Sequence, residues 1–364
     1  MQSKKLLVFH PIIAPYRIDF FNELSKFFEI KVCLFWHNLK DQTFDYQKIE
    51  QQLSFKPVYL DKKYGPYRKG LFKQLSEFQP DIVLTPEFGF DTILTFIYKC
   101  VCQKKFKIVT ICDDSYDMLV GKNQFTWKHA LAEKILFPFI DDAIVVEPRV
   151  NDFIQKKYKK GIFFPIVQKD SRVRNILKRS LTISEKYINH YNLKEKKIFL
   201  FVGRLAKEKN LHTVIPIFKQ VLDNNSVFII VGDGPCKKEL MDLAHGANNI
   251  IFAGRYEGDE LYAWYNVADV FILPSTTEPF GAVTNEALLS GCFSLISSKA
   301  GSQCLIKEGF NGFKIDSTNI KNIEQRIKSL MPSPTKSKSS AIKENLMVQS
   351  FEAYFSNLLF HLKK

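Results

Sequence analysis

The segment IFLFVGRLAKEKN at residues 198–210 contains the pattern that decides the fold: an apolar run ends at a glycine, and a basic polar stretch follows. Similar apolar runs, each followed by glycine, proline or a polar turn, are VFIIVGDG (227–234), NIIFAG (249–254), ADVFILPS (268–275) and CFSLISS (292–298). Short runs that are apolar throughout are typical of parallel strands covered by helices on both faces. Residues 198–330 therefore predict a Rossmann-like domain.

The first half of the chain repeats this alternation of strands and helices. Its apolar runs are KKLLVFH (4–10), IKVCLFW (30–36), DIVLT (81–85), KIVTIC (107–112) and DAIVV (142–146). Residues 1–166 thus predict a second Rossmann-like domain. Residues 167–197 lack strand runs and are highly charged, so we place the interdomain connection there. In residues 331–364 we expect a loop followed by a closing amphipathic helix.

Length and composition agree with two ordinary globular domains. The chain has 364 residues, 46% hydrophobic and 25% charged, which excludes disordered and collagen-like classes. Its seven cysteines form no CxxC pair and have no histidine at zinc-finger spacing, so we expect a reducing, cytoplasmic compartment. No signal-peptide cleavage site follows the first residues and no run of 18 apolar residues occurs, which predicts a soluble or peripheral protein.

The net charge of +14 raises the question of an anionic partner. Nucleic acid is disfavoured because no zinc-finger, RNP or KH signature accompanies the charge. The segment RVNDFIQKKYKKG (149–161) places four lysines beside Phe153, Ile154 and Tyr158, and such a helix is able to rest on an anionic membrane surface. A solvated lysine face is an equal alternative.

Two segments of the second half carry residues suited to an anionic ligand. Arg204 and Lys209 follow a predicted strand, where they are placed to grip a diphosphate, although a basic pair is also common on surfaces. In PSTTEPFGAVTNEALLSG (274–291), we expect a helix from near Pro279 to Gly291.

The backbone N–H groups around Phe280 and Gly281 then stand at a helix N-terminus, which favours negative charge and sugar oxygens. Glu278 suits sugar hydroxyls, and Glu286, two turns along the predicted helix, suits a ribose diol. The alternative is that both glutamates only solvate the helix end.

Together these motifs resemble the donor site of family 4 glycosyltransferases. The resemblance is carried by GRLAKEKN (203–210), VGDGP (231–235), the E-x7-E pair with its PFG core, and HPIIAPYRIDFFNELS (10–25), so it covers nearly the whole chain. It implies an α/β fold of the GT-B type, with two Rossmann-like domains, a cleft between them and a C-terminal helix packing back on the N-terminal domain. It also implies transfer of a sugar, with retention of configuration, from a nucleotide-sugar donor to a glycan or lipid-linked saccharide in surface polysaccharide or cell-envelope glycan synthesis.

The resemblance also assigns roles to residues. Arg204 and Lys209 would bind the donor diphosphate, Glu278 the transferred sugar and Glu286 the ribose. The family's usual glycine after the lysine is replaced here by Asn210. A family histidine near the reacting sugar is also missing, because KIVTICDDSYD (107–117) offers Asp113 or Asp114 at that place. Either aspartate is a catalytic candidate, and a helix cap is the plain alternative.

The remaining candidates are acceptor contacts at His10, Tyr16 and Arg17, with a loop packed on its own domain as the alternative, and base contacts at Arg255 and Tyr256. No Asp-x-Asp triplet occurs, so we expect no metal and no cofactor beyond the nucleotide-sugar substrate. Rival interpretations are an inactive glycosyltransferase-like scaffold subunit and an epimerase or phosphorylase of the same fold.

Overall fold

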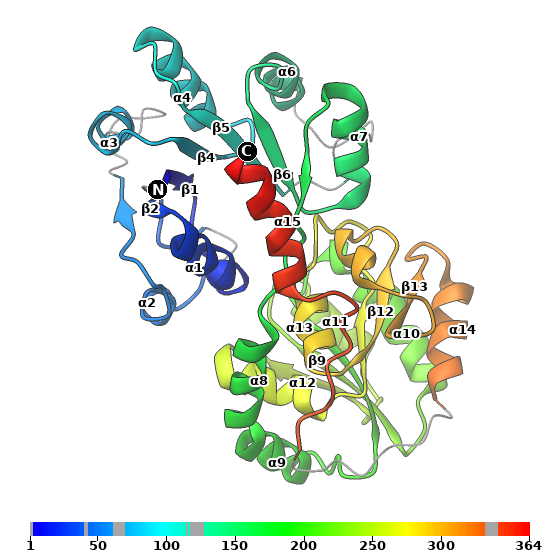
Figure 1. Cartoon of the computed structure of the whole chain (residues 1–364). Coiled ribbons are helices and arrows are strands. Elements are labelled where there is room, and N and C mark those ends of the chain that lie inside the picture. The colour runs from blue at the N-terminus through cyan, green and yellow to red at the C-terminus, as the bar shows by residue number, and fades with distance from the viewer. Residues whose placement is uncertain (1–2, 40–42, 61–69, 114–115, 117–126, 332–340) are drawn as a thin grey trace. The chain divides into compact units, whose positions relative to one another are not determined.

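The structure is a computed structural model that describes residues 3–39, 43–60, 70–113, 116, 127–331 and 341–364. The chain divides into two compact units (Figure 1). Unit 1 comprises Met1–Gln168 together with Tyr354–Lys364, and unit 2 comprises Lys169–Ala353. Each unit is a parallel sheet with helices, as the alternating sequence pattern predicts.

Unit 1 contains a seven-stranded parallel sheet in the order β3-β2-β1-β4-β5-β6-β7. Its central strands are buried because their side chains are apolar on both faces, as in β1, where Leu6 to Phe9 have no exposed surface. The strands are β1 (Lys5–His10), β2 (Glu29–Leu34), β3 (Val58–Tyr59), β4 (Ile82–Pro86), β5 (Lys107–Cys112), β6 (Asp142–Val145) and β7 (Ile162–Phe163). The helices are α1 (Ile18–Phe27), α2 (Tyr46–Glu50), α3 (Leu71–Phe78), α4 (Phe90–Val101), α6 (Trp127–Leu136) and α7 (Pro148–Tyr158).

Unit 2 contains a six-stranded parallel sheet in the order β10-β9-β8-β11-β12-β13. The strands are β8 (Lys197–Val202), β9 (Ser226–Val231), β10 (Ile250–Gly254), β11 (Val270–Leu273), β12 (Phe293–Ser297) and β13 (Gly312–Ile315). The strand order reverses between β8 and β11, and ligands of such sheets bind beyond the carboxyl ends of the strands at that switch point. The loop with Arg204 follows β8, and the loop with Glu278 follows β11.

The helices of unit 2 cover both faces of this sheet. They are α8 (Asp170–Arg179), α9 (Leu181–His190), α10 (Leu211–Val221), α11 (Lys237–Leu243), α12 (Gly258–Val267), α13 (Val283–Leu289) and α14 (Ile320–Leu330). Helices α8 and α9 account for most of the charged segment at 167–197, and they belong to unit 2 with α12 as their neighbour. Their charges lie on outer faces, while Val173 and Leu177 are fully buried.

The last helix, α15 (Phe351–Lys363), returns to unit 1 from Tyr354 onward, as expected. Its Phe355 ring lies 6.0 Å from Phe27 and 6.3 Å from Phe164, measured between centroids. Residues 332–340 of the predicted loop lie outside the described residues. Within the described part of the chain, no helix is both long enough and apolar enough to cross a membrane. The expected cleft between the domains stays a prediction.

Candidate functional site

The Arg204 loop of unit 2 is held by close backbone contact with the loop after β9. Leu205 donates its N–H to Asp233 O at 2.8 Å, and Cys236 donates its N–H to Leu205 O at 2.9 Å. A Cβ on Gly234 would lie 2.5 Å from Leu205 O, and one on Gly232 would lie 1.9 Å from Gly203 O. The VGDGP sequence is therefore explained by two backbones that meet with no room for side chains.

Lys209 and Glu278 are brought together by this arrangement. They form a close ion pair, with 17% and 12% of their side chains exposed. The two loops are also joined by the Thr276 N–H, which donates to Glu208 O at 2.9 Å. Ser275 Oγ lies 3.4 Å from the Glu278 carboxylate. An ammonium and a carboxylate thus stand side by side where the carboxyl ends of β8 and β11 meet.

Asn210 stands where the resemblance leads us to expect glycine. Its φ of 58° is left-handed, a conformation that asparagine tolerates better than most residues. The buried side chain donates to Pro274 O at 3.2 Å and to Ser317 O at 2.9 Å, and it accepts from Thr213 Oγ1 at 2.8 Å. Asn210 therefore ties three segments together around Lys209, a role that sequence reasoning missed.

Arg204 lies on the same loop but has a different partner. Its guanidinium pairs with Glu208 at 2.6 Å, and 46% of its side chain is exposed. An exposed pair four residues apart is weakly held, because solvent screens it. The Arg204 side chain is consequently able to exchange this partner for an anion at little cost.

Glu286 is nearly buried at 9% exposure, and its carboxylate accepts a hydrogen bond from Tyr265 Oη at 3.0 Å. Burial, together with the nearby Glu286, raises the pKa of Tyr265 well above its usual value, so the phenol stays a donor. The expectation that Glu286 lies two turns along its helix is wrong. Helix α13 begins at Val283 and has seven residues, which puts Glu286 in its first turn.

The PFG residues hold the loop before α13 in shape. Phe280 is buried, with 2% of the residue exposed. Gly281 has a φ of 90°, and a Cβ there would lie 2.7 Å from Leu273 Cδ2. Ser302 donates its N–H to Phe280 O at 2.8 Å, and the Gly301 N–H donates to Glu278 O at 3.2 Å.

The base-side candidates point to neighbours within unit 2. Arg255 pairs with Glu257 at 2.5 Å. The Tyr256 ring lies 5.9 Å from Tyr187 and 6.1 Å from Trp264, between centroids, so it packs toward α9 and α12.

In unit 1 the structure brings Arg17 and Asp113 together as a close ion pair. The Arg17 side chain is 2% exposed, whereas that of Asp113 is 40% exposed. Arg17 Nε and Nη1 are buried and have no hydrogen-bond partner among the residues that the structure describes. Tyr16 occupies the 3-10 turn Pro15–Arg17, and Asp114 lies outside the described residues. Asp113 therefore pairs with a buried arginine.

His10 stands next to this pair as a neutral ring. Burial and the Arg17 charge lower its pKa to about 4, against the opposing effect of Asp113. Its Nδ1 bonds to Ile12 O, and a carbonyl oxygen only accepts, so Nδ1 carries the hydrogen. The other ring nitrogen, Nε2, is left as an acceptor at neutral pH.

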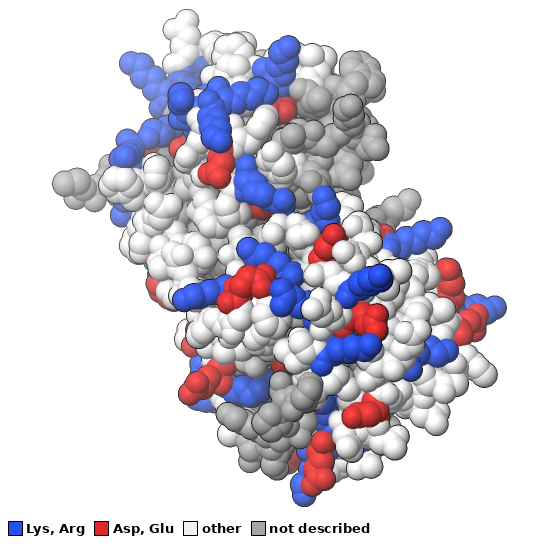
Figure 2. Space-filling model, turned by 90° about the vertical axis from the view of Figure 1, so that its right-hand side faces the viewer, with Lys and Arg blue, Asp and Glu red and all other residues white. Residues whose placement is uncertain are grey.

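The lysine-rich helix α7 differs from the expectation of a lipid-facing amphipath. Its apolar side packs into unit 1, where Val150 and Ile154 are buried and Tyr158 stacks on Phe137 at 4.2 Å. Figure 2, which faces the side of the molecule that carries α7, shows Lys and Arg side chains gathered there. Only the charged face of α7 is left for a partner.

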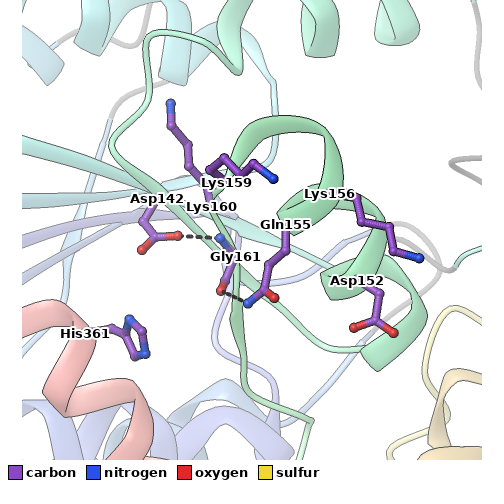
Figure 3. Close-up of a pocket in the computed structure, with 8 residues that line it drawn as sticks. All are labelled: Asp142, Asp152, Gln155, Lys156, Lys159, Lys160, Gly161 and His361. Carbon is purple, nitrogen blue, oxygen red and sulfur yellow. Dashed lines mark hydrogen bonds between the residues drawn. The ribbon is translucent and has the colours of Figure 1, made fainter.

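A cavity of about 520 Å³ lies beside α7 (Figure 3). Two charged residues that line it form hydrogen bonds with backbone groups of unit 1. Lys160 Nζ donates to Phe137 O at 2.9 Å and to Pro138 O at 3.1 Å, and burial lowers its pKa. Asp142 accepts the Gly161 N–H at 2.7 Å. The cavity is lined by Asp142, Asp152, Gln155, Lys156, Lys159, Lys160, Gly161 and His361, which gives it both signs of charge.

In comparisons with known proteins, the family match falls within unit 2. Residues 184–346 match the family model described as Glycosyl transferases group 1. An uncharacterized glycosyltransferase of Methanocaldococcus jannaschii is 35% identical over 122 residues, which cover 32% of this chain and 31% of that protein. The UDP-Gal:alpha-D-GlcNAc-diphosphoundecaprenol alpha-1,3-galactosyltransferase of Escherichia coli is 31% identical over 150 residues, covering 36% of this chain and 38% of that protein. These matches span about a third of each relative.

A solved structure resembles the whole chain. It is the crystal structure of Anabaena HepE in complex with UDP and glucose, with a TM-score of 0.77, 16% identity and 99% of both chains covered. At this identity the likeness concerns the fold, and it confirms the expected GT-B architecture of two Rossmann-like domains.

Proposed function

We propose, from the match of residues 184–346 to the glycosyl transferases group 1 family model, that the chain transfers a sugar from a nucleotide-sugar donor to a saccharide or lipid-linked saccharide. The observation that carries the proposal is the Lys209–Glu278 pair at the switch point of the unit 2 sheet, with Glu286 on the helix that follows. A cation suits the diphosphate, and two carboxylates suit sugar and ribose hydroxyls.

In the proposed reaction the bond between the anomeric carbon and the diphosphate oxygen breaks. The acceptor oxygen forms its bond on the same face of the sugar, so configuration is retained. The acceptor proton passes to the departing phosphate oxygen. Lys209 and Arg204 stabilise the negative charge that develops on that oxygen, while Glu278 holds the sugar hydroxyls. Retention rests on the family resemblance.

Screening by thermal shift with UDP-, GDP- and ADP-sugars tests the donor class. We expect the sugars of one nucleotide, UDP, GDP or ADP, to raise the melting temperature of the protein, because a bound ligand stabilises the folded state. The anomeric configuration of the product, read by NMR, then tests retention. Absence of any shift across the panel, together with no release of nucleotide, would favour the inactive scaffold instead.

We also propose that the transfer step needs no divalent ion at the diphosphate. Lys209 and Arg204 supply the positive charge that a metal supplies elsewhere. Turnover should change less than about twofold when Mg²⁺ or Mn²⁺ is added or omitted. Phosphate oxygens prefer such hard ions, so a strong dependence on them would contradict this part of the proposal.

For an acceptor carried on a lipid, we propose that unit 1 rests on an anionic membrane through an apolar ridge, defined as Ile97, Val101, Leu131, Ile135 and Phe139. These side chains are 44% to 76% exposed. The ring of Phe96 on α4 lies 5.0 Å from that of Phe139 after α6, which joins the two helices. Exposed lysines close to these residues in the sequence are Lys104, Lys105 and Lys134. Exposed apolar side chains accompanied by lysines suit an anionic lipid surface.

Vesicle sedimentation tests the ridge. Wild-type protein should sediment with vesicles that contain anionic lipid, and less so at high salt. Val101→Asp with Ile135→Asp should abolish this binding, whereas Ile320→Asp, at an exposed apolar position of unit 2, should not. Equal sedimentation of all three proteins would refute the ridge.

A further inference from the structure

Three side chains with metal-binding atoms meet at the start of α10 and α11 in unit 2. His212 is the second residue of α10, Cys236 directly precedes α11, and Glu239 lies three residues further on. Their ligand atoms all lie within 4.8 Å of one another. None of these residues belongs to the donor candidates.

His212 and Glu239 approach each other closely. His212 Nε2 lies 3.1 Å from Glu239 Oε1. This nitrogen is nevertheless buried and makes no hydrogen bond within the described part of the chain. Two ligand atoms on one tetrahedral zinc ion, each about 2.0 to 2.2 Å from the metal, lie about 3.3 to 3.6 Å apart. The observed spacing of 3.1 Å is slightly shorter, so a small separation of the two side chains would admit the ion.

We propose that His212, Cys236 and Glu239 bind one Zn²⁺ ion, with water as the fourth ligand. A thiolate and an imidazole select zinc over magnesium, because they are softer ligands than oxygen. Cys236 is buried, whereas the Glu239 side chain is 64% exposed, so the ion enters from the carboxylate side. Binding replaces the thiol proton with a metal–sulfur bond, and the proton is released to solvent.

The ion would fasten the helices on either side of the Arg204 loop. His212 lies three residues after Lys209, and Cys236 donates its backbone N–H to Leu205 O at 2.9 Å. A metal that joins His212 to Cys236 therefore connects both ends of this loop. This is a structural role, separate from the proposed absence of a metal at the diphosphate, where hard ions and not zinc would act.

Cobalt spectroscopy tests the proposal on the full chain. The background variant is Cys100→Ser with Cys102→Ser, which removes the two exposed cysteines of unit 1. Metal-free protein is titrated with Co²⁺, and the thiolate-to-cobalt charge-transfer band and the tetrahedral d–d bands are recorded. Competition with Zn²⁺ then gives stoichiometry and affinity. No turnover is measured, so failure here is distinguishable from failure of the proposed transfer activity.

We expect one Co²⁺ per chain with a thiolate band that Zn²⁺ displaces, and a rise in melting temperature of roughly 5 °C at saturating Zn²⁺. Cys236→Ser should lose the band, and His212→Asn should weaken binding at least about tenfold. Glu239→Gln should weaken binding but keep the band. A spectrum without the thiolate band, or binding that is unchanged in both Cys236→Ser and His212→Asn, would overturn the proposal.

Discussion

At the scale of single residues, the donor candidates depend on a few side chains that fix loops. Lys209 and Glu278 meet because Asn210 turns the chain with a left-handed φ of 58° and binds two carbonyl groups from other loops. In this partly buried position the two opposite charges compensate each other, whereas either charge alone would be buried without a partner. When a donor binds, we expect Lys209 to contact the phosphates and Glu278 to contact the sugar hydroxyls.

Substitution of Asn210 separates its backbone role from its side-chain role. Asn210→Gly keeps the left-handed φ but loses three hydrogen bonds, and should cost about 1 to 2 kcal/mol in the free energy of unfolding. Asn210→Ala loses the same bonds and adds strain at positive φ, which should cost about 1 kcal/mol more. Urea unfolding measures both values. Equal stability of Asn210→Ala and wild type would contradict this role.

His10 gives the chain a predictable response to acid. Its folded pKa of about 4 lies below the ordinary value of 6.5, so the unfolded chain binds more protons between these pH values. The free energy of unfolding should fall by about 2 kcal/mol between pH 7.5 and pH 5 from this group alone. His10→Gln should remove that part, and the exposed His245→Gln should not. Identical pH dependence in both variants would count against the assignment.

At the scale of elements, the strands were predictable because buried parallel strands are largely apolar, as in β8, where the five residues after Lys197 are apolar and buried. Helix faces were harder to predict. In α7, Ile154 and Tyr158 are equally suited to lipid or to a protein core, and only packing decides between them. The start of α13 was also misplaced, because Pro279 favours a helix N-terminus but the chain first turns at Gly281.

The Tyr265–Glu286 contact could not be predicted, since the two residues lie on separate helices 21 positions apart. Tyr265→Phe removes the donor to the Glu286 carboxylate, and should weaken nucleotide affinity about tenfold through loss of a charge-assisted hydrogen bond. Calorimetric titration with the best nucleotide measures this effect. Tyr191→Phe, a half-buried tyrosine of the same unit, is the control. Unchanged nucleotide affinity in Tyr265→Phe would show that the Tyr265–Glu286 hydrogen bond does not contribute to nucleotide binding.

At the scale of the whole molecule, the two-domain α/β architecture followed from repeated strand patterns, and the return of the chain to unit 1 followed from the amphipathic final helix. The C-terminal helix completes unit 1 by burying Phe355, Leu358 and Leu362. Which elements surround Arg17 could not be read from sequence, because Asp113 is far from it along the chain. The ion pair joins the turn after β1 to the end of β5, so it depends on the sheet of unit 1.

Truncation of the Leu358 side chain should show how far the stability of unit 1 depends on α15. Leu358→Ala leaves a cavity and should lower the stability of unit 1 by about 2 to 5 kcal/mol. Hydrogen exchange should quicken in β1 and α1, while the amides of β8 and β11 in unit 2 keep their rates. Phe360→Ala, at a position 59% exposed, is the control. Faster exchange confined to unit 2 would contradict the assignment of the helix to unit 1.

Donor binding by two neighbouring lysine variants tests the central claim most directly. Lys209 pairs with Glu278, whereas Lys207 on the same turn is exposed. Titration calorimetry with the best nucleotide-sugar should show unchanged affinity for Lys207→Ala and a loss of at least about tenfold for Lys209→Ala. Equal donor affinity in wild type, Lys207→Ala and Lys209→Ala would contradict a donor site built on the Lys209–Glu278 pair.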